Sequence, residues 1–535
     1  MRITNSMMTA NTKANINVNK TNADRLNTMT ASGQKITRPS DDPVVAIRAM
    51  RLNTSLSELE QYHGKNIPDA DAWFTDTETA LVQADEVLTS IREKLNQASS
   101  EENVTSNVKD ILEELKQLKA QYYSIGNADS AGRTVFTGYR TSEMLTFMEA
   151  DKINYAITEP VNARDIEDCS YVFGTKDVDK DGNAASTDYK EENIELKSFK
   201  RVRLAYDNLL DDQGAGKGDG TVSYKDATGT PKTMTCSFAS INDTDIDTVY
   251  KTAMSASVPT IIRETGEMII PDSVYEELKD STDITVEYAK DTWQKGDLRP
   301  EHYFKCWTPK DSADPRTYSS SYVEGIEYNF NRFDSEGNPI SGNRPQDVTA
   351  TASLLGFKEQ ELTYEIAFNQ SIQINTHAND SFSHDIGREI DELVNITKLM
   401  ADAETKVADI KNAVEKATTD ADKAAFSKTL AAAEKERTLL REKMHKMYTS
   451  ALTSFKEYSD GLNEQVANLG ALTSRLEMTK NRVKDQQNNV KKIADENINA
   501  DLSETAIDYK SAQLALEAAQ MAAGKIANQT LLNYI

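Results

Sequence analysis

A heptad period of apolar residues near both ends of the chain is the feature that most constrains its fold. In one segment the apolar positions alternate spacings of four and three residues, and in another they recur every seven. They are Val104, Val108, Ile111, Leu115, Leu118, Tyr122 and Ile125 in the first segment, and Leu462, Leu469, Leu476, Val483 and Val490 in the second. A seven-residue period is typical of helices that wrap around one another with a left-handed twist. Both ends of the chain are therefore predicted to form long helices that need helical partners.

The middle of the chain has a different pattern. Nine of the twelve prolines lie between Pro160 and Pro345, and the three cysteines, Cys169, Cys236 and Cys306, also lie there. Apolar and polar residues alternate in this region, as in half-buried strands. The alternating sets are Val222 and Tyr224; Met234, Cys236 and Phe238; Ile284, Val286 and Tyr288; Ile326, Tyr328 and Phe330; and Leu362, Tyr364, Ile366 and Phe368. The middle is therefore predicted to be rich in β-structure.

Together these patterns predict an α+β fold. A long-helix coiled-coil bundle is expected from the N- and C-terminal segments, with a β-rich domain inserted in the middle. We expect residues 1–40 and 497–535 to form an inner coiled-coil domain of terminal helices. Residues 41–147 and 385–496 are expected to form a helical bundle domain, and residues 148–384 the β-rich inserted domain.

A polar corner is predicted between the first two helices, formed by Arg38, Pro39, Ser40, Asp41, Asp42 and Pro43. Arg38 precedes a proline, and this position disfavours helical backbone. Asp42 is expected to cap the next helix, because its side chain can accept hydrogen bonds from the first free N–H groups. Pro43 suits the first helical position, where no N–H is needed. The corner therefore links two helical domains.

The two ends of the chain carry opposite charge and weak apolar stripes. Residues 1–40 hold six basic residues and one acidic residue, a charge of +5, and residues 496–535 hold five acidic and two basic residues, a charge of −3. Residues expected to take part in assembly are Ile3, Met7, Leu26, Met29, Ile36, Leu502, Tyr509, Leu516, Ile526, Leu531 and Leu532. Helices with sparse stripes form mainly by packing against something. Two alternatives stay open: the ends pair inside the monomer, or they order only when neighbouring subunits cover them.

Residues 1–20, 26–49 and 497–535 carry sequence that resembles the flagellin superfamily, with weaker similarity at residues 135–147 and 369–382. Within that superfamily, the two prolines of the corner and the Leu-Leu-Asn-Tyr-Ile ending favour the proteins of the hook–filament junction over the filament flagellins. The cysteines of the middle region depart from the pattern of axial flagellar proteins, which usually avoid this residue. That departure concerns the inserted domain and not the terminal helices.

The resemblance implies a structural role without catalysis. The terminal helices would line the central channel of a tubular assembly, and the inserted domain would face outward. The implied partners are hook-associated protein 1, flagellin, further copies of the same chain in a ring-like zone, and an export chaperone that holds the C-terminal end. Secretion by the flagellar type III apparatus to the extracellular hook–filament junction would follow. A filament flagellin is the nearest alternative, and a middle domain with enzymatic or glycan-binding activity is an alternative of another class.

One segment of the middle region imitates a calcium loop. Asp177, Asp179 and Asp181 lie at alternate positions, Gly182 follows, and Asp188 is the twelfth residue. Carboxylates at these positions are calcium ligands in EF-hand loops. The final ligand is Asp instead of Glu, so an aspartate-rich turn without an ion is the preferred interpretation. We expect no other metal site.

Charge and motifs exclude several function classes. The net charge of −25 disfavours a general nucleic-acid surface, which would be basic. No run of apolar residues is long enough for a membrane span. Neither a zinc-protease motif nor a local nucleophile signature occurs, so we expect no catalytic residues and no cofactor.

Overall fold

The chain divides into two compact units. The computed structural model describes residues 5–36, 38–40, 42–98, 105–210, 219–242, 245–309, 325–328, 332–333, 358–359 and 362–527. One unit, here called the terminal unit, comprises Met1–Asp71, Tyr364–Ile372 and Leu472–Ile535. The other, the central unit, comprises Ala72–Thr363 and Gln373–Ala471. Two long helices, α3 (Ile67–Ala98) and α9 (Asp420–Ile498), contribute residues to both units.

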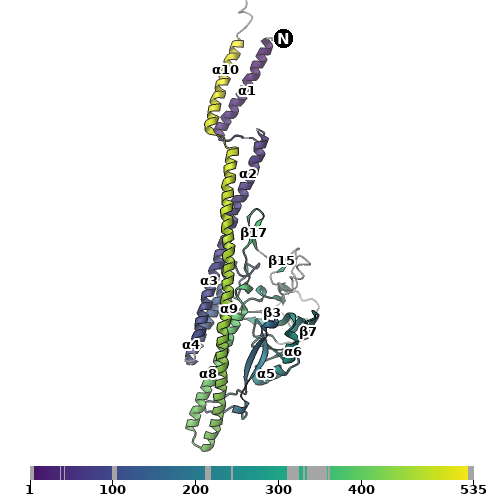
Figure 1. Ribbon diagram of the computed structural model, residues 1–535, viewed down its shortest axis with the longest axis vertical. Coiled ribbons are helices and arrows are strands. Elements are labelled where there is room, and N and C mark those ends of the chain that lie inside the picture. The colour runs from purple at the N-terminus through teal and green to yellow at the C-terminus, as the bar shows by residue number, and fades with distance from the viewer. Residues whose placement is uncertain are drawn as a thin grey trace, which may run out of the picture. The chain divides into compact units, whose positions relative to one another are not determined.

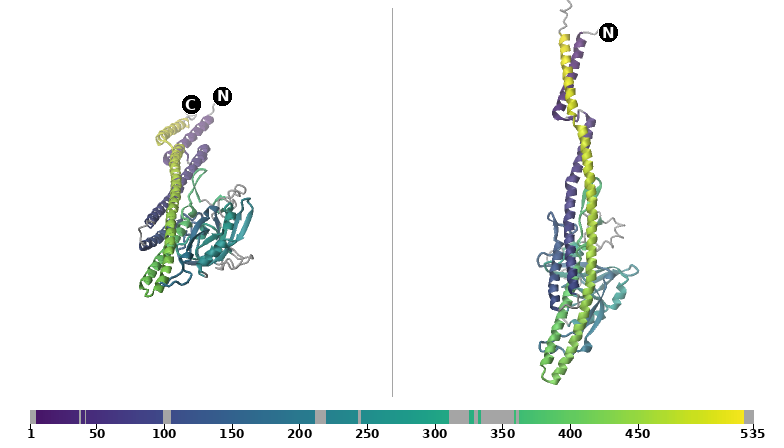
Figure 2. Two further views of the ribbon diagram at one scale, coloured as in Figure 1. Left: turned by 60° about the horizontal axis from the view of Figure 1, so that its bottom comes forward. Right: turned by 60° about the vertical axis from the view of Figure 1, so that its left-hand side comes forward.

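The terminal unit is built around the two ends of the chain. Helices α1 (Asn5–Ser32) and α10 (Leu502–Ala527) lie side by side in both views (Figures 1 and 2). After the corner come α2 (Pro43–Gln61), a π-helical turn η1 (Tyr62–Asn66) and the start of α3. Strands β16 (Thr363–Ala367) and β17 (Gln370–Gln373) form a hairpin. The Asn66 side chain donates a hydrogen bond of 2.7 Å to the carbonyl of Glu365, which ties this hairpin to the start of α3.

The helices of the central unit bury several of the predicted heptad positions. Helix α4 (Thr105–Ile125) buries Leu115 and Tyr122 completely, and α9 buries Leu462 and Leu469. Helix α8 (His384–Lys416) packs along α4, and Lys119 of α4 forms an ion pair of 2.6 Å with Asp391 of α8. These heptads therefore form core seams.

Two sheets occupy the middle of the chain. A six-stranded antiparallel sheet has the order β13 (Gly325–Tyr328), β12 (Lys305–Pro309), β3 (Asp151–Val161), β11 (Thr282–Trp293), β6 (Thr221–Lys225) and β7 (Pro231–Thr235). A five-stranded sheet has the order β4 (Glu167–Phe173), β5 (Glu195–Arg203), β10 (Glu267–Ile270), β9 (Thr260–Ile262) and β8 (Ser237–Ala239), and its last pair is parallel. Two short pairs join β1 (Asp129–Ser130) to β2 (Arg133–Thr134), and β14 (Arg332–Phe333) to β15 (Lys358–Glu359).

Short helices complete the central unit. Helix α5 (Ile246–Ser255) packs on the five-stranded sheet through Val249, Tyr250 and Ala253, and α6 (Asp272–Leu278) precedes β11. Single 3₁₀ turns are η2 (Ala163–Asp165), η3 (Glu191–Asn193), η4 (Pro300–His302) and η5 (Ala378–Asp380).

The β-rich region and the helices of the central unit share a core. Val172 of β4 and Ile194 pack in one buried cluster with Ile396 and Ile410 of α8 and Ala432 of α9. Figure 1 shows the sheets beside these helices. Shared burial explains why the insertion is not an independent appendage: removing the helices would expose its apolar residues to water.

The structure confirms the α+β class and most of the predicted strands. The alternating sets at Val222, Ile284 and Leu362 lie in or beside β6, β11 and β16. Phe330 lies outside the described residues. Helices α5 and α6 were not predicted, because each is too short to display a clear helical period.

Candidate assembly site at the chain ends

The two terminal helices pack against each other within one chain. Leu26 and Ala23 of α1 bury against Ala512 of α10, and each is less than one-tenth exposed. Met29, Tyr509 and Leu516 pack around this contact. The pairing is antiparallel, since the Asn19 side chain donates to the carbonyl of Ala515 at 3.4 Å while Leu26 meets Ala512. The sequence left open whether the two ends pair within the monomer or order only against neighbouring subunits, and in the structure they pair within the chain.

The contact contains four of the residues that the sequence assigns to assembly: Leu26, Met29, Tyr509 and Leu516. The others are placed as follows: Met7 and Leu502 are 55% exposed, Ile36 is half-buried, Ile526 lies in α10 with a side chain outside the described set, and Ile3, Leu531 and Leu532 lie outside the described residues. Whether any of them contacts a neighbouring subunit stays a prediction.

A second apolar stripe on α10 escaped the sequence analysis. Ile507, Leu514 and Met521 recur every seven residues and are 67%, 64% and 66% exposed. At 3.6 residues per turn, two residues along a helix correspond to a rotation of about 200°. Ile507 therefore faces away from Tyr509, and the stripe lies on the opposite side of α10 from the residues that contact α1. Its heptad spacing was the available signal, hidden by the alanines and by the stronger stripe at Leu502, Tyr509 and Leu516.

Helices α1 and α2 also expose apolar side chains. Met7, Met8 and Val18 on α1 are 55%, 39% and 66% exposed. Val44, Ile47 and Met50 lie at spacings of three along α2 and are 76%, 54% and 59% exposed. Apolar residues in helical register are normally covered, so these stripes mark surfaces suited to further helices.

The corner caps α2 as the sequence predicts. The Asp42 carboxylate accepts hydrogen bonds from the backbone N–H groups of Val44 at 3.0 Å and Val45 at 3.1 Å. Its backbone is extended, with φ −148° and ψ 100°, and Pro43 occupies the first turn of the helix. Arg38, Pro39 and Ser40 are exposed, and Asp41 lies outside the described residues. Asp42 and Pro43 therefore fix the start of α2, and the residues that precede them in the corner are exposed.

The two segments that join the helix pair to the rest of the terminal unit are bonded to each other. Gly33 ends α1 with φ +69° and accepts a hydrogen bond of 2.9 Å from the N–H of Ala500. The N–H of Lys35 donates to the carbonyl of Ile498 at 2.8 Å. A side chain at Gly33 would disfavour this left-handed backbone. These bonds couple the entry to the corner with the start of α10.

A polar cavity of about 690 Å³ lies beside this junction. Its lining includes Arg25, Lys35 and Arg38 from the N-terminal segment, and Asp501 and Glu504 from α10 and the residue before it. The opposite charges noted in the sequence therefore meet around one cavity. A polar cavity of this size has room for a polar side chain from a neighbouring protein.

The calcium-like segment folds as a tight turn. The Asp179 carboxylate accepts hydrogen bonds from the N–H groups of Asn183 at 2.8 Å and Asp181 at 3.0 Å, and these bonds lower its pKa. Within the described part of the chain, a metal-competent group converges at Glu143, Glu301 and His302, and the four aspartates are not in it. A turn without an ion stays the preferred interpretation, and calcium binding by Asp177, Asp179, Asp181 and Asp188 stays the untested alternative.

Comparison with known families finds a match for the N-terminal quarter of the chain. Residues 3–141 match the bacterial flagellin N-terminal helical region. The resemblance to the flagellin superfamily is therefore confirmed over these residues. The matched region contains α1, the corner, α2, α3 and α4. The similarity at residues 497–535 lies outside the match.

Two solved structures are similar to this chain at low identity. The first is flagellar hook associated protein-3 from Legionella pneumophila, at 8% identity, with 84% of this chain and 98% of that chain covered and a TM-score of 0.29. The second is FlgL from Xanthomonas campestris, at 11% identity, with coverage of 82% and 99% and a TM-score of 0.23. Comparison with curated proteins finds no match.

The helices that the structure describes include none with both the length and the apolar character needed to cross a membrane.

Proposed function

We propose that this chain is a structural component of the bacterial flagellum, an adaptor that connects the flagellar hook to the filament. Its terminal helices would pack between like and unlike neighbours, with hook-associated protein 1 on one side and flagellin on the other. The observation that carries this proposal is the second stripe of α10, Ile507, Leu514 and Met521, which remains about two-thirds exposed in the isolated chain.

Burial of that stripe would supply substantial binding energy. Fully burying a large aliphatic side chain is worth about 1.5–3 kcal/mol. With about two-thirds of each side chain available, the three residues would contribute about 3–6 kcal/mol per subunit contact. The exposed stripes on α1 and α2 would add to this contact. A tubular array of helices provides neighbours on two sides of α10, which a single antiparallel pair does not.

The form of the corner supports a junction protein over a filament flagellin. Pro39 and Pro43 frame a corner in which Asp42 caps α2, and the resemblance associates this form with junction proteins. In this proposal residues 1–40 and 497–535 form the inner domain, residues 41–147 and 385–496 the bundle, and residues 148–384 the outward-facing insertion. Secretion to the hook–filament junction by type III export, an export chaperone at the C-terminal end and copies of the chain in a ring-like zone complete the proposal.

We expect no catalytic activity from the inserted domain. A polar cavity of about 560 Å³ lies between parts of the central unit, and it is the place where an enzymatic or glycan-binding function would be sought. Its cations face carboxylates: Lys119 lies 2.6 Å from Asp391, and Lys290 lies 3.2 Å from Asp207. The charges of the cavity are thus neutralised within the chain, which favours a structural role for them.

The test replaces the stripe and follows filament attachment. Cells that lack this chain would be complemented with the triple variant Ile507→Gln, Leu514→Gln and Met521→Gln. The side chains are exposed, so the variant should fold and be exported, and hooks should lack filaments in electron micrographs. A matched control replaces exposed polar residues of the same helix, Lys510→Gln, Glu517→Gln and Gln520→Ala. The control should restore filaments, and the amount of chain in the medium reports export in both strains.

Filaments of normal number and length on cells with the exported triple variant would refute assembly through this stripe. Loss of filaments with the polar control as well would show that α10 is sensitive to any change, and would equally contradict a specific apolar contact.

A further inference from the structure

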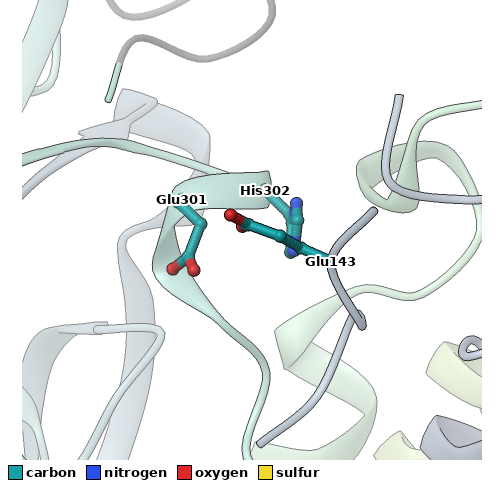
Figure 3. Close-up of side chains that lie close together, drawn as sticks. All are labelled: Glu143, Glu301 and His302. Atoms are coloured by element: carbon teal, nitrogen blue, oxygen red, sulfur yellow. The ribbon is translucent and has the colours of Figure 1, made fainter. Parts of the chain in front are cut away.

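A buried cluster in the central unit brings together three side chains that suit a metal ion. Glu301 and His302 belong to η4, and Glu143 comes from the loop that precedes β3. One ligand atom from each of the three lies within 4.8 Å of the others. Figure 3 shows the Glu143 side chain extending toward Glu301 and past the His302 ring. The cluster is remote in sequence from the calcium-like turn, and the structure places it in a different part of the central unit.

Two of the three side chains are buried with polar atoms that lack a partner. Glu301 is 2% exposed and His302 is 1% exposed. Atoms Oε2 of Glu301 and Nδ1 of His302 are buried and have no hydrogen-bond partner. Buried polar atoms are normally satisfied, so a pair of unsatisfied acceptors in one cluster calls for a partner of positive charge.

The histidine is held in a form that binds metals. Its Nε2 lies 3.0 Å from the carbonyl oxygen of Met144, which is a donor position for Nε2–H and leaves the lone pair on Nδ1. Neutral imidazole with one N–H fixed by a backbone carbonyl is the usual arrangement of a ligating histidine.

Two arginines lie near these carboxylates, Arg140 and Arg299, and Arg299 contacts them loosely. Its Nε lies 3.5 Å from Oε1 of Glu301, and its Nη1 lies 3.9 Å from Oε2 of Glu143. Neither distance is that of a good hydrogen bond. The guanidinium also lies over the ring of Phe147, at 4.9 Å from the centroid, and can keep that contact while releasing the carboxylates. Arg140 instead donates to the backbone carbonyl of Glu301.

We propose that Glu143, Glu301 and His302 form a site for one divalent transition-metal ion of the zinc class. One imidazole nitrogen with two carboxylates is a ligand set that suits Zn²⁺ better than Ca²⁺ or Mg²⁺, which prefer oxygen ligands alone. The half-buried Glu143, whose side chain is 40% exposed, provides the entry path. The ion displaces Arg299 from the carboxylates and ties the loop at Glu143 to η4.

Calorimetric titration of the full chain with Zn²⁺, without a histidine tag, tests the proposal. We expect one ion per chain. Glu143→Gln and His302→Gln should each weaken binding by about tenfold or more, since loss of even a supporting residue costs this much at zinc sites. Arg299→Gln should strengthen binding because the competing cation is gone. The matched controls are Glu149→Gln and His445→Gln, which change exposed residues and should leave binding unaltered.

His302 is buried, so His302→Gln could fail to fold. Glu143 is partly exposed, so Glu143→Gln should fold and still test the site. Saturable binding that Glu143→Gln leaves unchanged would overturn the proposal, as would the absence of saturable Zn²⁺ binding to the wild-type chain. Cys306 is buried four residues beyond His302, so Cys306→Ser serves as a further control. Loss of binding in that variant, with binding retained in Glu143→Gln, would assign the ion to a thiolate instead.

Discussion

Glu159 on β3 is a buried carboxyl group whose protonation should control the stability of the central unit. It is 8% exposed, and it accepts hydrogen bonds from the N–H of Ala205 at 3.0 Å and from the hydroxyl of Tyr288 at 2.5 Å. Burial raises its pKa to about 7, against the opposing effect of these two hydrogen bonds. The nearby charge of Asp385 raises this pKa further, whereas the charge of Arg388 lowers it.

The sign of the pH dependence follows from that pKa. Between the ordinary value of 4.5 and about 7, the folded chain keeps a proton on Glu159 that the unfolded chain releases. The free energy of unfolding therefore falls as the pH rises through this window. At about 1.4 kcal/mol per pKa unit, the full loss corresponds to about 3.5 kcal/mol, and about 2.5 kcal/mol of it falls between about pH 5 and about pH 8.

Replacing Glu159 with glutamine removes the titrating carboxyl group and should flatten the pH dependence of the free energy of unfolding. Urea unfolding at several pH values can be followed by the fluorescence of Trp73, Trp293 and Trp307, all of which belong to the central unit. The difference in unfolding free energy between about pH 5 and about pH 8 should shrink by about 2.5 kcal/mol in Glu159→Gln. Part of the slope should remain, because burial also raises the pKa of Glu389 to about 7.

Glu195→Gln is the control, since Glu195 is an exposed carboxylate on β5 of the same unit. It should keep the wild-type slope. If Glu159→Gln keeps the same slope as the wild-type chain, the carboxyl is already ionised in the folded protein at low pH, and the reasoning from burial is wrong.

Three further changes test the terminal unit. Asp42→Ala removes the cap of α2 and should cost about 1 kcal/mol, seen as faster amide exchange in the first turn, whereas exchange equal to the wild type would refute the cap. Leu476→Asp with Val483→Asp places two carboxylates at positions that are 1% and 0% exposed, and should unfold the terminal unit by circular dichroism. Unchanged melting would show that this seam is not core. Gly33→Val forces a β-branched residue to φ +69° and should cost about 1–2 kcal/mol, with amide exchange accelerated at Ala500.

Local patterns in the sequence predicted the parts of the fold that depend on local physics. The proline at position 43 and the preceding aspartate define the start of α2, because capping involves only neighbouring residues. The seven-residue period at Leu462, Leu469 and Leu476 predicted buried positions of α9, because one face of a helix is read directly from spacing. The strand at Ile284 was predicted by alternation for the same reason.

Pairing between distant segments could not be predicted in this way. Strand β3 pairs with β11, more than one hundred residues later, and no local period encodes that register. An isolated antiparallel β-bridge between Thr146 and Leu298 brings the segment of Glu143 close to that of Glu301 and His302. This contact joins distant parts of the chain, so the sequence alone showed only separate acidic residues and a histidine. The stripe at Ile507 was visible as a heptad, yet its exposure became evident only once α1 was known to cover the opposite side of α10.

Immunogold electron microscopy of isolated hook–filament complexes tests the proposed junction role most directly. An antibody raised against the β-rich region, residues 151–293, would be applied to complexes from cells that carry the wild-type chain, and cells that lack it would supply the background. The account predicts gold confined to the boundary between hook and filament. Gold along the whole filament would contradict it and identify the chain as a filament flagellin.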